Sequence, residues 1–567
     1  MSAPRRRRSK RRQGLSRREF LRRGIGSAAV LGAATLLPAC GGGSSGGREP
    51  QSPAEPVFKH GVASGDPLSD RVILWTRITA YISGTQAVTA DIATDPGFTQ
   101  NLQRIEGSTT AARDWTVKFD VQGLSPATTY YYRFEALGQT SPIGRTRTLP
   151  VGSVERLRIA VLSCSSYAHG FFNAYARVAE RADLDLVLHL GDYIYEYGNG
   201  EYGEARTYEP PHEIVSLEDY RARHGYYKLE PELQALHRQH PMVCVWDDHE
   251  SANDAWRDGA ENHQPELEGA WSSRKAAAQK AYEEWMPIRA PDPTRIFRHF
   301  AIGDLVELLM LDTRLFARSQ PLTPTLGVPG IPFGVFTAIG EFLDPARTLL
   351  GDEQEQWLVQ RLRSTSARWK LLGQQVMFGQ LKLLGLPNVT RLSQFINADQ
   401  WDGYPVARDR IFAALAGDGV NAPIDNAVVL TGDIHTAWAM DLTPDPNNLL
   451  PATGGYNALN GEGSRAVEFV ATSVTSPGLE DLTIAQPVLR LQNPHLKHVD
   501  LAAKGYLLLD ITPEHCRGEF WQVDGIAVRS GGERFDIAFE TLNGSNRLRR
   551  ADASQPRAGA PELAPMG

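Results

Sequence analysis

Five apolar runs in this sequence are each about the length of one buried β-strand, and each stops at a short polar motif. The runs cover residues 157–163, 185–190, 242–246, 306–311 and 427–431, and helical patterns between them cover 171–182, 273–285 and 352–362. Strands that alternate with helices predict a layered α/β domain. In such domains ligands bind just beyond the carboxyl ends of the strands. We therefore expect the polar motifs to meet at one edge of a sheet, although they lie far apart in the chain.

Four of these strand ends carry side chains that bind metal ions. They supply Cys164; Asp192 and Tyr195 in Gly-Asp-Tyr-Ile-Tyr-Glu; Asp248 and His249 in Trp-Asp-Asp-His-Glu; and Asp433 and His435 in Gly-Asp-Ile-His. Each motif alone is ordinary, because Gly-Asp is a common turn and a single cysteine often fills a core. Adjacent acids after an apolar strand, however, repel one another unless cations lie nearby. The joint occurrence of these motifs at strand ends predicts a metal site.

In this order the motifs resemble those of the metallophosphoesterase superfamily, and in detail those of its PhoD-type alkaline phosphatase branch. Three further stretches are similar to that branch: Trp401-Asp402-Gly403-Tyr404-Pro405, Leu311-Asp312-Thr313-Arg314, and His-Gly-Val-Ala-Ser-Gly-Asp-Pro at 60–67. The resemblance covers roughly residues 56 to 540. It implies a layered sheet-and-helix domain that hydrolyses phosphate esters.

The resemblance also implies a site with one Fe³⁺ and Ca²⁺. The implied ligands are Cys164, Asp192, Tyr195 and His435 for iron, and Asp192, Asp248 and Asp433 for calcium, with Asp192 bridging the metals. Asp248 stands where most of the superfamily has asparagine, and the adjacent Asp247 is an open alternative. A binuclear site with Zn²⁺ or Mn²⁺ is a second open alternative.

The donor chemistry agrees with this assignment on independent grounds. A thiolate, a phenolate and carboxylates stabilise a highly charged ferric ion, whereas calcium prefers carboxylate and water oxygens. A bound metal removes the proton of a coordinating thiol. A metal role for Cys164 therefore also explains a free cysteine in an exported protein.

These residues lead to an expected mechanism, in which metal-bound hydroxide attacks phosphate monoesters, and also diesters, without a covalent enzyme intermediate. Asp192 would be central to catalysis, and His249 would donate a proton to the leaving group or orient the phosphate. Arg314 would clamp the phosphate with two hydrogen bonds, or else form an ion pair with Asp312 or another acid. His189 lies inside a strand and is expected to be a core residue.

Two other functions use the same residues. The first is a phosphodiesterase, similar to a phospholipase D, that acts on phospholipid or teichoic acid. The second is a non-enzymatic surface protein in which the metals only stabilise the fold. Comparing rates on nitrophenyl phosphate and bis-nitrophenyl phosphate separates monoesterase from diesterase action.

The first 40 residues have the order of an export signal. Residues 16–21, Ser-Arg-Arg-Glu-Phe-Leu, match the twin-arginine pattern, and a modest apolar stretch follows at 25–37. That stretch is shorter than the roughly 20 residues needed to cross a bilayer, so it predicts a signal peptide and not an anchor. Cys40 follows small residues, as in a lipoprotein processing site. We expect the twin-arginine export machinery as a partner, a periplasmic, secreted or lipid-anchored location, and a membrane tether through Cys40 as an option.

Charge and cysteine content restrict the function further. The first 40 residues hold eleven Arg or Lys and one Glu, so a total of −7 leaves a net charge near −17 for the rest. Such an acidic protein is not expected to bind a nucleic-acid duplex, because backbone phosphates attract Lys and Arg. The chain has four cysteines, too few for a disulfide framework.

The composition divides the remaining chain into four parts. Residues 41–55 are rich in Gly, Ser and Pro and predict a flexible linker. Residues 56–150 read as strands and turns, and the Leu-Ser-Pro turn before a Tyr-rich strand at 129–134 resembles the tyrosine corner of fibronectin-like sandwiches. We therefore expect a small all-β sandwich there, the catalytic domain over 151–545, and a disordered tail over 546–567.

Overall fold

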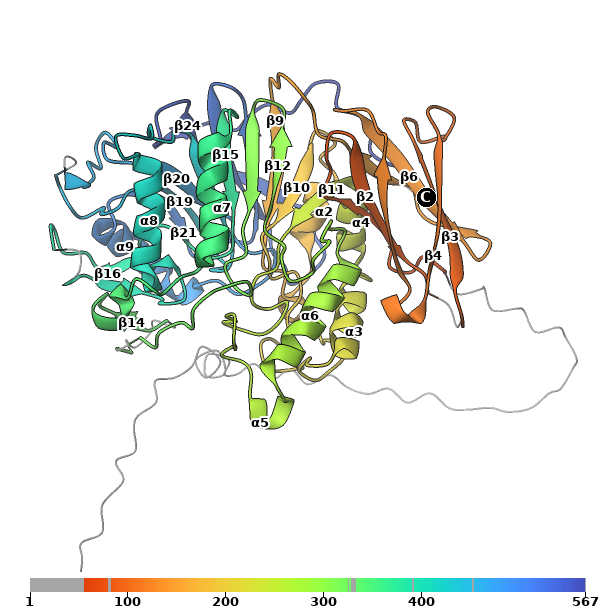
Figure 1. Cartoon of the computed structure of the whole chain (residues 1–567), viewed down its shortest axis with the longest axis horizontal. Helices are drawn as coiled ribbons and strands as arrows, with labels where there is room; N and C mark the ends of the chain where they lie inside the picture. Colours follow the sequence, from red (N-terminus) through yellow and green to blue (C-terminus); the bar gives the residue numbers. More distant parts are fainter. Residues whose placement is uncertain are drawn as a thin grey trace, which may run out of the picture.

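The computed structural model describes residues 56–79, 83–324, 326–327, 333–389, 392–450 and 453–565 (Figure 1). The expected signal peptide, the linker and Cys40 lie outside these described residues. Within the described ranges, no helix combines the length and the apolar character that crossing a membrane requires.

Two large sheets form the centre of the molecule. The first has ten strands in the order β25 (Leu548–Ala551), β24 (Glu533–Leu542), β23 (His515–Val523), β22 (Gly505–Ile511), β9 (Leu157–Leu162), β10 (Leu186–His189), β11 (Pro241–Cys244), β1 (Val62–Gly65), β2 (Arg71–Arg77) and β5 (Thr116–Gln122). The second has seven, in the order β12 (Arg298–Ile302), β13 (Val306–Met310), β15 (Trp369–Gly373), β18 (Ala427–Thr431), β20 (Ala466–Val470), β19 (Ala437–Leu442) and β21 (Leu496–Asp500). The strands that carry the motifs run parallel within each sheet, namely β9–β10–β11 and β13–β15–β18.

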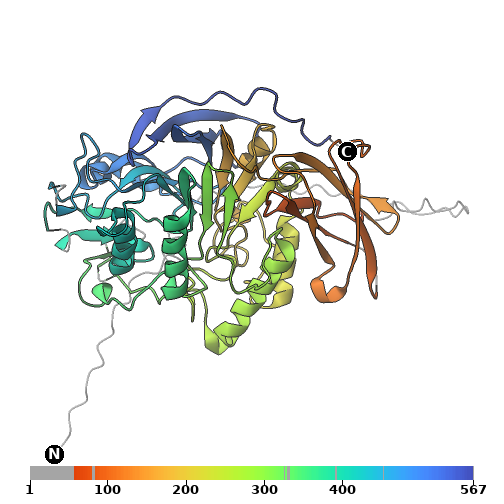
Figure 2. The same ribbon diagram turned by 45° about the horizontal axis from the view of Figure 1, so that its top comes forward.

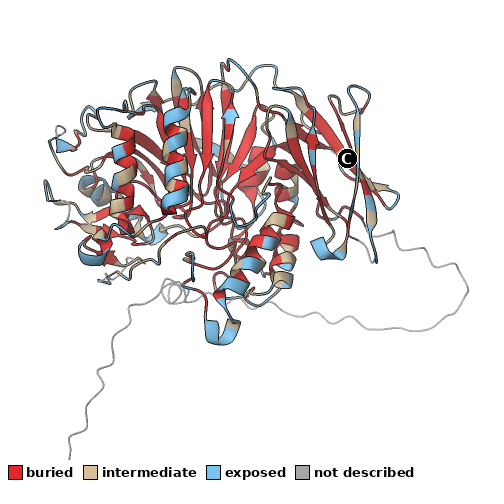
Figure 3. Ribbon diagram, viewed as in Figure 1, coloured by how far each residue is buried: buried red, intermediate tan, exposed pale blue. Residues whose placement is uncertain are grey.

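Helices cover the outer faces of both sheets. The main ones are α2 (Asn173–Ala179), α3 (Leu217–Tyr227), α4 (Pro231–Gln239) and α6 (Trp271–Trp285) on the first sheet, and α7 (Gly351–Ser364), α8 (Pro405–Ala416) and α9 (Gln486–Gln492) on the second. Successive side chains of a strand point to opposite faces. Leu308 of β13 accordingly packs in the core between the sheets, and its neighbour Leu309 packs in the core under α7 and α8. In Figure 3 the helices α7 and α8 are buried toward the sheet and exposed on the outside. The predicted layered α/β class is confirmed.

Shorter elements complete the described chain. They are the three-stranded sheet β14 (Val335–Phe336), β17 (Gln394–Ile396) and β16 (Lys382–Leu384), the short helix α5 (Pro265–Glu268), and the 3₁₀ turns η1 (Ala111–Arg113), η2 (Tyr167–His169), η3 (Gly340–Leu343), η5 (Trp401–Gly403) and η7 (Glu480–Ala485). The turn η5 holds part of the Trp-Asp-Gly-Tyr-Pro motif, and it lies beside the candidate site described below.

The N-terminal part is a small β-sandwich, as expected. A sheet of β4 (Gln103–Thr109), β3 (Gln86–Ala93), β6 (Thr129–Ala136), β7 (Gln139–Thr140) and β8 (Gly144–Arg147) packs against β2 and β5. The hydroxyl of Tyr130 accepts a hydrogen bond from the Ser125 amide at 2.8 Å, which is the geometry of a tyrosine corner.

The sandwich shares a sheet with the following domain, which the sequence did not predict. Strand β1 pairs in parallel with β11, with Gly65 opposite Met242. A Cβ atom at Gly65 would lie 2.2 Å from the carbonyl oxygen of Pro287, so the Ser-Gly-Asp part of the motif at 60–67 needs glycine for this close approach. The two domains are therefore joined through continuous backbone pairing.

The prediction of a disordered tail is wrong for residues 546–565. Strand β25 pairs with β24, and the chain then runs across the first sheet to the sandwich (Figure 2). Arg557 forms an ion pair with Asp185 at 2.6 Å, and the amide of Ala564 donates to Gln239 at 2.8 Å. A composition rich in Arg, Ala and Pro suggested too little apolar surface for order, but these specific polar contacts hold the segment in place.

Candidate metal centre

The motif side chains meet at one edge because the strands that carry them are parallel. Cys164 follows β9, Asp192 follows β10, and Asp247 and Asp248 follow β11, while Asp433 follows β18 in the second sheet. The carboxyl ends of parallel strands lie at the same edge. The candidate site thus combines loops from both sheets.

The backbone at these loops is unusual. Cys164, Asp192, Asp433 and His435 have φ angles of 61°, 55°, 61° and 63°. Non-glycine residues rarely occupy this left-handed region, and each case costs on the order of 1–3 kcal/mol unless the surroundings enforce it. Such residues cluster at functional sites, and here they are four of the predicted metal ligands.

One group of ligand atoms contains sulfur, nitrogen and oxygen donors. Those of Cys164, Asp192 and His435 all lie within 4.8 Å of one another. The hydroxyl of Tyr195 donates to Asp192 Oδ2 at 2.9 Å and lies 3.2 Å from His435 Nε2. Nδ1 of His435 lies 2.9 Å from the carbonyl oxygen of Pro477 and must donate to it, so Nε2 faces the group. These are the four residues predicted to hold iron.

A second group consists of carboxylates. Ligand atoms of Asp247, Asp248 and Asp433 lie within 4.8 Å of one another, and so do those of Asp192, Asp248 and His249. Asp248 therefore belongs to both sets. Asp247 Oδ1, in contrast, is engaged by Arg314 Nε at 2.5 Å. Between the two adjacent acids, this geometry favours Asp248 as the ligand.

The electrostatics of the site fit bound cations. Burial, with a further contribution from nearby acids, raises the pKa values of Asp192 and Asp247 well above the usual range. Burial likewise raises the pKa of the Cys164 thiol and the Tyr195 phenol. Among the described residues, Asp192 Oδ1 and Asp247 Oδ2 are buried without a hydrogen-bond partner. Burying a carboxylate without a partner is costly, and a nearby cation removes that cost and favours the ionised forms.

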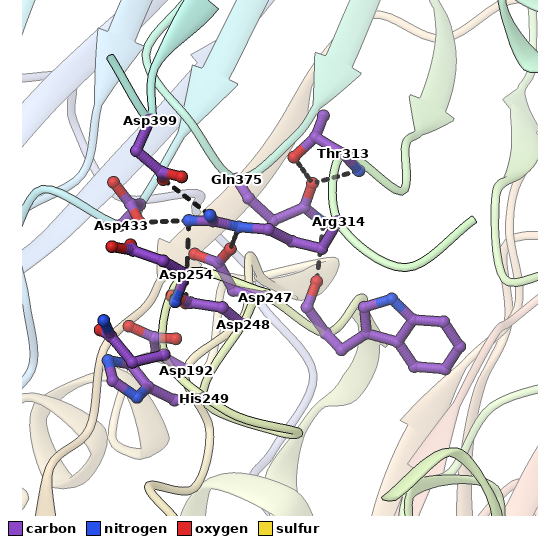
Figure 4. Close-up of polar contacts among 12 residues, drawn as sticks. Asp192, Asp247, Asp248, His249, Asp254, Thr313, Arg314, Gln375, Asp399 and Asp433 are labelled. Atoms are coloured by element: carbon purple, nitrogen blue, oxygen red, sulfur yellow. Dashed lines mark hydrogen bonds and ion pairs between the residues drawn. The ribbon is translucent and has the colours of Figure 1, made fainter. Parts of the chain in front are cut away.

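Arg314 lies across the carboxylates and not toward an open space (Figure 4). Its Nε, Nη1 and Nη2 atoms lie 2.5, 2.6 and 2.6 Å from Asp247, Asp399 and Asp433, and the side chain is fully buried. Burial lowers the pKa of Arg314, but the surrounding acids outweigh this and hold it well above its usual value. Each guanidinium nitrogen thus contacts a protein acid, which favours the ion-pair alternative over the phosphate-clamp role expected for Arg314. The structure shows the ion-pair alternative, but Asp312 is not one of the ion-pair partners. The Asp312 side chain instead accepts a hydrogen bond from the backbone amide of Arg314 at 2.9 Å.

His249 has a carboxylate partner that the sequence analysis missed. Its Nδ1 donates to Glu196 Oε2 at 2.7 Å, and its ring stacks on Tyr195 with 4.2 Å between centroids. Glu196 is held in turn by the amide of Asn253 at 2.9 Å and the side chain of Asn262 at 2.8 Å. Burial lowers the pKa of His249, but Glu196, Asp192 and Asp248 raise it to a net value of about 10. Glu196 ends the Gly-Asp-Tyr-Ile-Tyr-Glu motif, so its position in the sequence was the available indication.

Glu250 is a second residue whose role was missed. Its carboxylate accepts the backbone amides of Asp192, Tyr193 and Asp247 at 3.1, 2.6 and 2.8 Å. It therefore fixes the loop after β10 to the loop after β11. His189, in contrast, is a buried core residue as predicted, with Nε2 2.8 Å from the Tyr175 hydroxyl.

The layered fold and the gathered carboxylate, imidazole, thiol and phenol groups define a layered α/β protein with a buried site able to hold metal ions. The chain belongs to the PhoD-like phosphatases: the PhoD-like phosphatase family model matches residues 159–520, and the model of the PhoD-like phosphatase N-terminal domain matches residues 44–150. It is therefore a phosphatase, which sets aside the non-enzymatic alternative.

Individual relatives agree with this family. The chain is 36% identical to alkaline phosphatase D of Bacillus subtilis (strain 168) over 484 residues, covering 82% of this chain and 77% of the relative. A solved structure of PhoD superimposes with a TM-score of 0.78 at 32% identity, covering 90% of this chain and 95% of the other. The resemblance inferred from the motifs is thus confirmed.

Proposed function

We propose that this protein is an exported, metal-dependent phosphatase that hydrolyses phosphate monoesters. The observation that carries the proposal is the meeting of six side chains from both sheets at one edge. They are Cys164, Asp192, Tyr195, Asp248, Asp433 and His435.

The donor chemistry supports two kinds of cation. Cys164, Asp192, Tyr195 and His435 would hold Fe³⁺, and Asp192, Asp248 and Asp433 would hold Ca²⁺, since thiolate and phenolate suit a ferric ion and carboxylates suit calcium. A Zn²⁺ or Mn²⁺ pair is the alternative. When bound, such cations supply positive charge to the phosphate oxygens and lower the pKa of a coordinated water.

The residues of this chain provide the remaining functions. His249, oriented by Glu196, would donate its Nε2 proton to the ester oxygen as the phosphorus–oxygen bond to the alcohol breaks, while water supplies the new oxygen on phosphorus. The Glu196 carboxylate opposite Nδ1 favours the protonated ring that this role requires. Arg314 would keep Asp433 and Asp247 in place and would not touch the substrate.

We also propose export by the twin-arginine pathway, on the strength of residues 16–21. The destination would be the periplasm, the medium or, through Cys40, the membrane surface. Replacing Arg17 and Arg18 by lysine should retain the protein in the cytoplasm. Unchanged export of that double variant would contradict this route.

Elemental analysis combined with an activity assay tests the core of the proposal. Purified protein should contain iron and calcium, chelation should abolish hydrolysis of nitrophenyl phosphate, and returning the metals should restore it. Rates on bis-nitrophenyl phosphate, measured in parallel, should be lower than on the monoester. Full activity in metal-depleted protein would overturn the metal dependence, and a higher diester rate would overturn the monoester preference.

A further inference from the structure

Asp433 is held by hydrogen bonds on both of its carboxylate oxygens. Arg314 Nη2 donates to Oδ1 at 2.6 Å, and Gln400 Nε2 donates to Oδ2 at 2.6 Å. Each carboxylate oxygen has two lone pairs, so one such bond leaves room for a cation on the same oxygen. The two donors thus fix the direction of the carboxylate.

Gln400 is itself fixed at both ends of its amide. It is 2% exposed and precedes the turn η5. Its Oε1 accepts the backbone amide of Met377, which lies in the loop after β15. Because an N–H group must face the amide oxygen, the Nε2 end has to face Asp433. Gln400 therefore connects the loop after β15 to the carboxylate after β18.

Asp399, the residue before Gln400, orients Arg314, which is the other hydrogen-bond donor to Asp433. Asp399 Oδ2 accepts from Arg314 Nη1 at 2.6 Å, and its other oxygen pairs with Arg318. These contacts set the plane of the Arg314 guanidinium, which then directs Nη2 to Asp433. Residues 399–400 thus act on Asp433 twice, directly through Gln400 and indirectly through Arg314.

We propose that Gln400 is a positioning residue, which orients the Asp433 carboxylate toward Asp248 so that these two acids, together with Asp192, can hold a divalent cation. The proposal rests on the proposed function, because it presumes that Asp433 is a metal ligand. The Trp-Asp-Gly-Tyr-Pro motif after Gln400 anchors the segment that holds Gln400. Trp401 donates a hydrogen bond to Gln374 at 2.8 Å, and Asp402 accepts one from the Leu381 amide at 2.8 Å. Losing an outer partner of a metal ligand typically weakens metal binding about 10–100-fold.

The test compares Gln400→Leu with Gln239→Leu in full-length, metal-depleted protein. Gln239 is a matched control because it is also buried and its amide is also held at both ends, by Ala564 at 2.8 and 3.1 Å, away from the acids. Calcium alone is titrated by calorimetry, and the rise in Tm on adding calcium is measured. Gln400→Leu should bind calcium about 10–100-fold more weakly and lose most of that rise, whereas Gln239→Leu should bind calcium like the parent protein.

Further variants separate the failure of this inference from the failure of the proposed function. Asp433→Asn should lose calcium binding altogether. If Asp433→Asn binds calcium like the parent, the calcium site itself is wrong. If Asp433→Asn loses calcium while Gln400→Leu keeps the parent affinity, only the positioning role is overturned. Should Gln400→Leu fail to fold, Gln400→Asn replaces it; its shorter amide cannot span both partners, and a parent-like calcium affinity in that variant overturns the role equally.

Discussion

Two acid-rich regions lie at opposite edges of the same sheet and are built differently. At the amino ends of β9 and β10, Asp183 pairs with Arg158 at 3.0 Å and Asp185 pairs with Arg557 at 2.6 Å. At the carboxyl ends, Asp192 has no ion pair with an arginine or lysine in the described part of the chain. Acids that are paired with arginines hold segments of the chain together. Buried acids that outnumber the nearby basic side chains need a bound cation instead.

The comparison explains why the edge at the carboxyl ends of the strands, called here the functional edge, lowers the stability of the folded chain. Asp183 and Asp185 show no unsatisfied carboxylate oxygen among the described residues, while Asp192 Oδ1 and Asp247 Oδ2 are buried without a hydrogen bond. Natural sites often sacrifice stability in this way for function. Substitutions at the two edges should therefore have opposite consequences for activity and stability.

Asp192→Asn should give the largest effect and the clearest contrast. It removes a carboxylate oxygen common to both groups of ligand atoms, so kcat/KM for nitrophenyl phosphate should fall about 10²–10³-fold, as for loss of a key electrostatic contact. Metal-free protein should be at least as stable as the parent in urea unfolding, because asparagine replaces a buried carboxyl group that is crowded by other acids. A variant that is active, or clearly less stable without metal, would contradict the comparison.

Arg314→Met should test the buried arginine that contacts three acids at the functional edge. Removing it leaves Asp247, Asp399 and Asp433 without their shared partner, so the free energy of unfolding of metal-free protein should fall by about 3–5 kcal/mol. Calcium should recover part of this loss, because it can replace some of the missing charge. Arg158→Met is the control: this buried arginine pairs with Asp183 at 3.0 Å at the amino ends of the strands, so it should destabilise without recovery by calcium.

Glu196→Gln should sharpen the comparison, since Glu196 is an acid at the functional edge that does have a charged partner. The variant keeps an acceptor for the Asn253 amide but removes the charge opposite His249 Nδ1. Rates on alkyl phosphates should fall about 10-fold or more, with little change on nitrophenyl phosphate, whose leaving group needs no proton. Glu213→Gln, one contact farther out beside Asn262, should change neither rate. An equal loss on both substrates would indicate a general structural defect and not proton donation.

The meeting of the candidate ligands at one edge could be predicted from the sequence, because those residues follow parallel strands. Cys164, Asp192 and Asp433 stand directly after apolar runs, and strand ends of that kind converge whatever the intervening loops do. Gln400 and the sheet-sharing strand β1 could not be predicted in this way. Their roles depend on partners such as Asp433 and Met242, which only the folded chain brings close.

The sequence left two roles open for Arg314, a phosphate clamp or an ion pair, for a related reason. Arg314 stands beside the site and has the chemistry of a phosphate clamp, but its partners are acids from three other loops. The prediction of a disordered tail failed because composition averages over residues. Order at 546–565 depends on single contacts, such as that of Arg557 with Asp185. Local patterns therefore predict where side chains project, and not which distant charge they meet.

Arg557→Ala should give the smallest effect. It tests the structural edge, at the amino ends of the strands, where acids are paired with arginines. Its ion pair with Asp185 is partly exposed, with side-chain exposures of 24% and 9%, so the free energy of unfolding should fall by only about 0.5–1 kcal/mol. Because the pair lies at the amino ends of the strands, kcat/KM and calcium affinity should stay unchanged. Urea unfolding and limited proteolysis should show the tail released before the rest of the chain unfolds. Reduced activity in a folded Arg557→Ala protein would mean that the two edges are coupled, and the division between a structural edge and a functional edge would then not hold.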